Sequence, residues 1–151
     1  MAKFIYKMQS LLNIKEKLEE QAKTAYGLAK AVLNEEEAKL AGLFTRKNQY
    51  IEEKRAGMSA TLNVHELTQL EHAIKSMEYK IAEQVLVVRQ AEKNVMLAQA
   101  KLENAMKERK IQEKLKEHAL EQFKQEMEAA EQQEINELVT YRFGKTRERE
   151  E

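Results

Sequence analysis

Histidines and carboxylates are the side chains of this sequence that could carry out chemistry. His65 is followed by Glu66, as in the His-Glu-x-x-His motif, whose two histidines bind zinc and whose glutamate acts as a base. Gln69 stands where that motif needs its second histidine. His65 and His72 share one face of a predicted helix, but no carboxylates stand beside them at ligand spacing. The sequence therefore predicts no metal site.

No other motif of catalysis or cofactor binding occurs in the sequence. There is no cysteine, which excludes disulfides and thiolate chemistry, and there is neither a glycine-rich phosphate loop nor a nucleophile elbow. Carboxylates instead stand four residues from lysines, as Glu103 does from Lys107, which is the spacing of ion pairs on a helix surface. We expect no catalytic residue, no cofactor and no enzymatic activity.

The composition favours long helices over a globular core. Of 151 residues, 34% are charged and 6% are aromatic, and the mean hydropathy is −0.72, so little apolar material is available for burial. The absence of proline removes the main breaker of helices. This amount of apolar material is enough for a seam between two helices.

Charge and hydropathy limit the classes of partner and the location. Lys+Arg and Asp+Glu both number 26, so the net charge is zero, and nothing predicts binding to nucleic acid or to an anionic membrane. The N-terminus has no apolar signal segment, and no run approaches the roughly 18 apolar residues of a membrane span. We expect a cytoplasmic protein that does not insert into the membrane and that attaches to it, if at all, through another protein.

The strongest pattern lies in residues 67–105. Apolar residues recur there at alternating steps of three and four, and Gln84 is the single polar member of the series. A period of 3.5 residues held over this length is typical of a coiled-coil seam. The series is Leu67, Leu70, Ile74, Met77, Ile81, Gln84, Val88, Ala91, Val95, Ala98, Leu102 and Ala105.

A second series of similar period precedes the first and predicts a helix at about residues 4–55. After Val32 two successive steps of four indicate a stutter, which would locally unwind the supercoil. Leu12, Tyr26 and Leu33 flank this series. Its members are Phe4, Met8, Leu11, Lys15, Leu18, Ala22, Ala25, Ala29 and Val32, followed by Glu36, Leu40, Leu43, Lys47 and Tyr50.

A short break separates the two series at about residues 56–63. Gly57 suits the left-handed residue that follows a helix end. Asn63 and Glu66 have the spacing of a capping box, in which the asparagine side chain accepts a hydrogen bond from the N3 amide. The second helix is therefore predicted at about residues 64–142.

Two long helices joined by so short a connection fold antiparallel. The sequence thus predicts an all-α chain, a single antiparallel coiled-coil hairpin over residues 1–144 whose second helix is the longer one. Facing residue numbers should add up to about 120 if the turn centres near residue 60. This rule places Lys15 near Ala105 and Lys47 near Ala73.

The same rule places Glu36 opposite Gln84, so that a polar member of one series faces a polar member of the other. Buried polar groups in coiled coils are known to set the register of the helices. We therefore expect these two side chains to form a shared polar layer.

The second helix is predicted to extend beyond its partner. Phe4 should lie opposite about residue 116 by the same rule, and the apolar series breaks at residues 107–110 before it resumes. The last roughly 30 residues are therefore expected to carry apolar side chains without a partner in the chain. Burying a large apolar side chain is worth about 1.5–3 kcal/mol, so these residues are a candidate surface for another protein. Residues 145–151 are expected to form a disordered tail. The members of the resumed series are Ile111, Leu115, Ala119, Phe123, Met127, Ala130, Leu138 and Tyr141.

Four stretches of the sequence resemble the FliJ family. Residues 4–22, with an aromatic residue, paired leucines and then a Lys/Glu-rich stretch ending in small residues, resemble the start of FliJ proteins. Residues 47–50 before the break, 70–74 after it and 141–143 near the end are similar to family segments in the same places. FliJ proteins are cytoplasmic components of the bacterial flagellar type III export apparatus.

The resemblance implies a hairpin similar to the central stalk of rotary ATPases. The end with both termini would enter the ring of the hexameric export ATPase, FliI, and the turn half would reach the export gate protein, FlhA, at the inner face of the cell membrane. Some family members also handle export chaperones. The residues expected at the ATPase ring are Leu115, Ala119, Phe123, Met127 and Leu138. Those expected at the gate are Leu43, Tyr50, Leu70 and Ala73, although Arg46 and Glu66 stand where some relatives have aromatic residues.

Rival interpretations predict a different oligomeric state for the protein or a different connection between its two helices. A coiled-coil scaffold or oligomerisation protein unrelated to secretion predicts a stable dimer whose C-terminal apolar residues pair, whereas the FliJ resemblance predicts a monomer or weak self-association. Leu43 and Leu70 are also seam positions, so they could serve the hairpin alone. A prefoldin-like chaperone hairpin is disfavoured, because residues 57–63 are too few and too polar for the strands between its helices.

Overall fold

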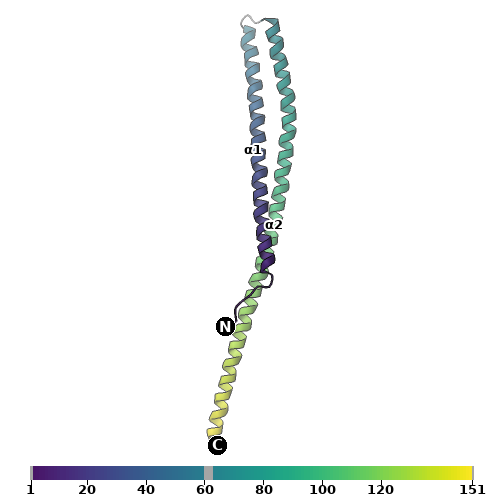
Figure 1. Cartoon of the computed structure of the whole chain (residues 1–151). Helices are drawn as coiled ribbons and strands as arrows, with labels where there is room; N and C mark the ends of the chain where they lie inside the picture. The colour runs from purple at the N-terminus through teal and green to yellow at the C-terminus, as the bar shows by residue number, and fades with distance from the viewer. Residues whose placement is uncertain (1, 60–62, 151) are drawn as a thin grey trace. The chain divides into compact units, whose positions relative to one another are not determined.

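Two helices make up nearly all of the described chain. The computed structural model describes residues 2–59 and 63–150. Helix α1 spans Gln9–Ser59 and helix α2 spans Val64–Glu150, and no strand occurs within the described ranges (Figure 1). The expected all-α fold with a longer second helix is confirmed. Glu19–Ala105 form one unit, and the residues at both ends of the chain form another.

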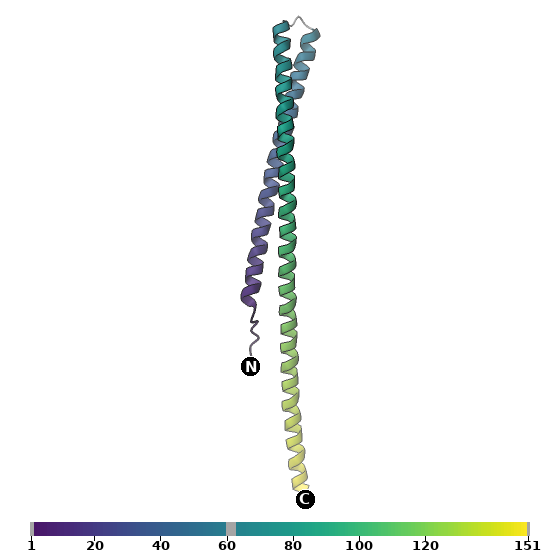
Figure 2. The same ribbon diagram turned by 90° about the vertical axis from the view of Figure 1, so that its right-hand side faces the viewer.

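In the unit Glu19–Ala105, α1 and α2 run antiparallel beside each other as a hairpin (Figures 1 and 2). All members of the predicted series over residues 67–105 are buried or half-buried, so the seam of α2 is confirmed. Its most buried apolar members are at most 9% exposed. They are Met77, Ile81, Val88 and Ala91.

The seam of α1 differs from the predicted one. Leu12, Glu19, Tyr26 and Leu33 are buried or half-buried, whereas Val32 is 48% exposed. With these four residues the series keeps its alternating steps of three and four along α1, so the predicted stutter after Val32 was wrong. Apolar residues stand next to each other at several positions of α1, so two series with the same period are possible in the sequence. Packing of α1 against α2 buries the series that includes Glu19.

Lysines at three seam positions of α1 reach across to glutamates of α2. Their long stems lie along the seam and carry the ammonium groups to its edge. Glu108 lies three residues beyond Ala105, the predicted neighbour of Lys15. Glu78 lies five residues beyond Ala73, the predicted neighbour of Lys47, so each glutamate is about one helical turn from the predicted position. The ion pairs are Lys15 with Glu108 at 2.9 Å, Lys47 with Glu78 at 3.5 Å and Lys54 with Glu71 at 3.3 Å.

Both ends of α1 differ from the predicted bounds of about 4 and 55. The helix begins at Gln9, and residues 2–8 are not helical. It continues to Ser59, whose hydroxyl donates to the backbone carbonyls of the preceding turn. Gly57 is buried within the helix, and no glycine of the described residues has a positive φ, so Gly57 is not the left-handed cap that was expected. Residues 60–62 of the predicted turn lie outside the described residues.

The start of α2 agrees with the prediction. Asn63 caps the helix, since its Oδ1 accepts a hydrogen bond from the backbone N–H of His65 at 3.2 Å. His65 is the N2 residue, one position before the expected N3 residue. The carbonyl of Asn63 accepts the first bond of the helix, from the N–H of Leu67 at 3.2 Å.

The C-terminal end of α2 extends to Glu150, whereas the sequence predicted an end near 142 and a disordered tail from 145. The Thr146 hydroxyl donates to the Arg142 carbonyl at 2.9 Å, and the ammonium group of Lys145 lies 5.0 Å from the centre of the Tyr141 ring. Arginines in the last turn also complement the negative end of the helix dipole. Local contacts of this kind continue the helix without any second helix to pack against.

The expected polar layer joins Glu36 of α1 to Gln84 of α2. Gln84 Nε2 donates to Glu36 Oε2 at 2.6 Å and to the Glu36 carbonyl oxygen at 3.0 Å. Lys39 Nζ lies 3.3 Å from the other carboxylate oxygen. A shift of the helices along the seam would leave two half-buried polar groups without these partners, which is costly. The hypothesis of a polar layer is confirmed.

We expect Glu36→Gln to make the stability of the hairpin less sensitive to acid. The hydrogen bond from Gln84 holds the pKa of Glu36 below its usual value against the effect of burial, and Lys39 also lowers it. Because the unfolded-state pKa is higher, about 4.3, this stabilisation is complete above that pH and is lost as the pH falls through the folded-state pKa. The melting temperature, followed by circular dichroism from neutral pH into the acid range, should fall less for Glu36→Gln than for the wild type.

The matched control for this experiment is Glu37→Gln, which removes a carboxylate from the exposed neighbouring position. It should show the same acid-induced fall in melting temperature as the wild type. Equal falls for Glu36→Gln and the wild type would contradict the linkage.

Candidate partner-binding surfaces

The structure does not arrange the histidines His65 and His72 as the ligands of a metal ion. The His65 ring instead contacts the Gln69 side chain, with 3.3 Å between the His65 Nε2 and Gln69 Nε2 atoms. Within the described ranges, no group of three or more histidine, cysteine or acidic side chains could hold a metal ion. In the same residues, neither helix contains a stretch apolar enough over sufficient length to span a membrane.

The four residues expected at the export gate all lie in the hairpin unit, at its seam. Leu43 and Tyr50 of α1 and Leu70 and Ala73 of α2 are half-buried, so each contributes to the packing of the hairpin and leaves part of its side chain accessible. Arg46 partly covers Tyr50, because its Nε donates to the Tyr50 hydroxyl at 3.3 Å and its guanidinium lies 5.9 Å from the centre of the ring.

A shallow groove beside Leu43 runs between the two helices. Gly42 gives it room, since no atom apart from its own neighbouring stretch of helix lies within 4 Å of where a β-carbon would be. Val87, which lines the groove, is 44% exposed, and Phe44, the residue after Leu43, is 45% exposed. The sequence series did not include these two residues. Large apolar residues outside the seam positions could have identified them as candidate binding residues. The groove is lined by Lys39, Gly42, Leu43, Arg46, Lys80, Glu83, Gln84 and Val87.

The terminal unit is built around α2. The series of half-buried residues continues there through Arg109, Gln112 and Lys116, so the predicted break at residues 107–110 does not interrupt the seam. Polar side chains occupy these positions, which is why the series seemed to end. Leu12 of α1, only 3% exposed, packs in this unit.

Residues 2–8, the N-terminal segment, lie against α2. The rings of Phe4 and Phe123 have their centroids 5.5 Å apart and are tilted by 53°. An extended chain advances about 3.3 Å per residue and a helix only about 1.5 Å, so Phe4 reaches Phe123 rather than the predicted position near residue 116. The expectation that apolar residues beyond 116 have no partner in the chain was therefore wrong as far as Phe123. Residues of this segment and of α2 that line one depression are Phe4, Tyr6, Met8, Ala119, Phe123 and Glu126.

The five residues expected at the ATPase ring fall into two groups. Ala119, Phe123 and Met127 are half-buried, the first two beside the N-terminal segment. Leu115 and Leu138 are 46% and 61% exposed. All five residues therefore lie on α2 within the terminal unit, but Leu115 and Leu138 are more accessible than the other three.

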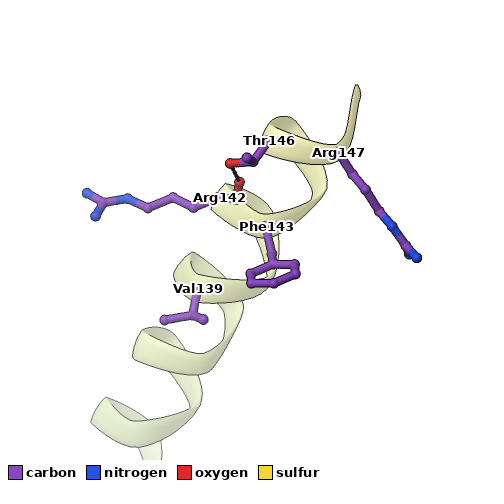
Figure 3. A pocket seen from close by; sticks show the side chains of 5 residues that line it. All are labelled: Val139, Arg142, Phe143, Thr146 and Arg147. Carbon is purple, nitrogen blue, oxygen red and sulfur yellow. Dashed lines mark hydrogen bonds between the residues drawn. The ribbon is translucent and has the colours of Figure 1, made fainter. Parts of the chain in front are cut away.

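Residues 128–149 form what we call the C-terminal extension. Every side chain in it is exposed, and no second helix of its own unit lies beside it in either view (Figures 1 and 2). Val139 and Phe143 lie one turn apart, and the side chains of Arg142 and Arg147 point away in different directions (Figure 3). A set of large apolar residues this exposed is a candidate interaction surface. The exposed apolar residues are Ile135, Leu138, Val139, Tyr141 and Phe143.

Comparison with known proteins identifies the family. The sequence profile of the flagellar FliJ protein family matches residues 4–148. The chain belongs to the FliJ family. A comparison with curated proteins finds no match. Among solved structures, the chain is similar to a candidate YscO homologue from Chlamydia trachomatis, with 23% identity, 89% of this chain and 90% of that chain covered, and a TM-score of 0.49.

The FliJ match confirms the resemblance that the sequence suggested. It begins at Phe4, in the N-terminal segment, and ends at Glu148, close to the end of the extension. Both features of the terminal unit are therefore parts of the FliJ region and not additions to it. A scaffold unrelated to secretion no longer competes, because a FliJ-family protein is a component of flagellar type III export.

Proposed function

We propose that this FliJ-family chain is a non-enzymatic link between the export ATPase and the export gate of the flagellar type III apparatus. The terminal unit contacts a hexameric, FliI-like ATPase, and the hairpin unit contacts an FlhA-like gate protein. The observation that carries the proposal is the C-terminal extension, a helix with five large apolar side chains, each at least 53% exposed, and no partner among the described residues.

The ATPase ring would bury the apolar side chains of the extension. Burying a side chain such as Leu138 or Ile135 is worth about 1.5–3 kcal/mol, so a few of them are sufficient for specific binding. The terminal unit has no rotational symmetry, so it also presents different residues to each subunit of a ring. A ligand shifts an equilibrium only through differential contacts with its states, and such an end supplies them. Phe123 and the N-terminal segment would form the adjoining part of this surface.

The gate would contact the half of the hairpin near residues 60–62. Tyr50 and Leu43 offer their accessible edges, and the groove with Gly42 and Val87 adds apolar surface beside them. Leu70 and Ala73 lie on the facing helix at the same seam. Aromatic side chains are enriched at binding hot spots, which makes Tyr50 the first residue to test.

The proposal extends to location and further partners, with support from family membership. We place the chain in the cytoplasm, associated with the inner face of the membrane through the export apparatus, without a cofactor. Escort of export chaperones, which some FliJ proteins perform, is an additional role within this proposal. The working form is a monomer, since a ring admits one shaft.

We expect Tyr50→Ala to weaken binding to the soluble domain of the gate protein roughly thirtyfold, since loss of a hot-spot side chain costs about 2 kcal/mol or more. The helical signal should remain, because an alanine keeps the helix and the buried residues of α2 are untouched. Isothermal titration calorimetry would measure the affinity. Tyr79→Ala is the matched control, since Tyr79 is 66% exposed and lies on α2 away from the seam residues Met77 and Ile81. Equal affinity of Tyr50→Ala and the wild type would refute this gate contact.

A further inference from the structure

One face of the C-terminal extension carries a symmetrical order of charges. Residues at alternating steps of three and four lie on one face of a helix, and here all of them are exposed. The first two are acidic, the middle two are apolar and the last two are basic. In chain order they are Glu128, Glu131, Ile135, Leu138, Arg142 and Lys145.

We propose that this face binds the same face of a second copy of the chain, with the two extensions antiparallel. A two-fold axis between residues 136 and 137 places Ile135 opposite Leu138 of the second copy. The same axis places Glu131 opposite Arg142 and Glu128 opposite Lys145. An isologous contact repeats each pair, so two apolar layers lie at the centre, and two pairs of opposite charges lie on each side of them.

The order of the charges favours a second copy over other occupants. A parallel alignment would set Glu131 against Glu131 and Arg142 against Arg142, which is repulsive. An anionic lipid surface would attract the basic part of the face and repel the acidic part. A partner of a single charge sign would likewise match only half of it. The antiparallel copy is complementary at every position of the six.

The two charged groups next to the apolar layers, those of Glu131 and Arg142, are available for such contacts. Neither side chain forms an ion pair within the described part of the chain, and the hydrogen bond from Thr146 reaches the backbone carbonyl of Arg142 and not its guanidinium. Two apolar layers are few for a coiled coil, and Lys124 and Arg149 are like charges that would meet at each end. The association is therefore weak and is reduced by salt.

Self-pairing and the proposed ATPase contact both use Leu138 and therefore exclude each other. The pairing itself does not depend on that function, because it rests only on the order of charges and apolar residues. In the cell it would cover the apolar face while no ring is bound.

Charge reversal tests the pairing with the full-length chain. Sedimentation equilibrium at low salt should show a monomer–dimer equilibrium for the wild type. Glu131→Arg sets arginines against Arg142 in both pairs, and Arg142→Glu sets glutamates against Glu131, so each variant should raise the dissociation constant roughly tenfold or more. An equimolar mixture of the two variants should recover the wild-type affinity or exceed it, because each pair is then complementary again.

Glu137→Arg is the matched control, with the same change of charge on the other side of the helix, and it should dimerise like the wild type. Circular dichroism should show unchanged helix content for all variants, since the substituted side chains are exposed. The proposal is overturned if the wild type stays monomeric, if the single variants dimerise as well as the wild type, or if their mixture dimerises no better than either alone. It is also overturned if the wild type binds anionic vesicles but not a second copy of itself, and if Arg142→Glu abolishes that binding to vesicles.

Discussion

A chain that ends at Met127 is expected to keep its fold and to lose its stimulation of the export ATPase. The removed side chains that the structure describes, those of residues 128–149, are all exposed, so their loss leaves the seam and the Phe4–Phe123 contact in place. They include Leu138 and the other exposed apolar residues on which the proposed ring contact depends. A chain that ends at Leu115 should in addition lose the packing of the N-terminal segment, because Phe123 is removed.

The experiment compares ATP turnover by the assembled ATPase with each of these chains added. Full-length protein should raise the turnover, and both truncated chains should leave it near the basal rate. A full-length Leu138→Gln variant should lose part of the stimulation, and Leu86→Gln is its control, since Leu86 is 63% exposed but lies in the hairpin unit. Undiminished stimulation by the chain that ends at Met127 would remove the extension from the proposed mechanism.

Ile81→Ala is expected to destabilise the hairpin unit strongly. Ile81 is 9% exposed in the seam of α2, and removal of a buried Ile, Leu or Met side chain to alanine costs about 2–5 kcal/mol. A seam between two helices can close partly around the lost atoms and is solvated at its edges, so we expect a value in the lower half of that range. The free energy of unfolding, measured by urea titration with circular dichroism, should fall by this amount.

The same substitution at an exposed site separates packing from helix propensity. Leu86→Ala removes a similar number of apolar atoms from the same helix, at a side chain that is 63% exposed. It should change the free energy of unfolding by no more than about 0.5 kcal/mol. Equal destabilisation by Ile81→Ala and Leu86→Ala would mean that the seam is not where the structure places it.

Much of the hairpin could be predicted from the sequence. Every member of the series from Leu67 to Ala105 is buried or half-buried in α2, because a 3.5-residue period held over so many steps fits only one face of a helix. Asn63 marked the start of α2, since an N-cap needs a short side-chain acceptor. The antiparallel rule brought Glu36 to Gln84, because a short connection leaves little freedom in the register.

Residue choices within α1 and the pairing of its lysines were decided by tertiary structure. At positions 11–12 and 32–33 two neighbouring apolar residues fit the period equally well, so the pattern alone could not select Leu12 and Leu33. The facing helix selects them, and with them the buried Glu19. A hydropathy pattern cannot identify Glu19 as a seam residue, because it scores every glutamate as polar even where the methylene groups of the side chain are buried.

The candidate partner surfaces show the same division. The sequence by itself determined that α2 outruns α1 and that apolar residues such as Leu138 continue beyond their partner, since both follow from helix lengths and composition. Only the tertiary structure decided where the unpartnered part begins. Residues 2–8 leave the helix and extend along α2, so Phe4 covers Phe123, and the exposed extension starts after Met127. The physical reason is that a period reports which residues share a helix face, whereas the reach of a non-helical segment depends on contacts between residues far apart in the chain.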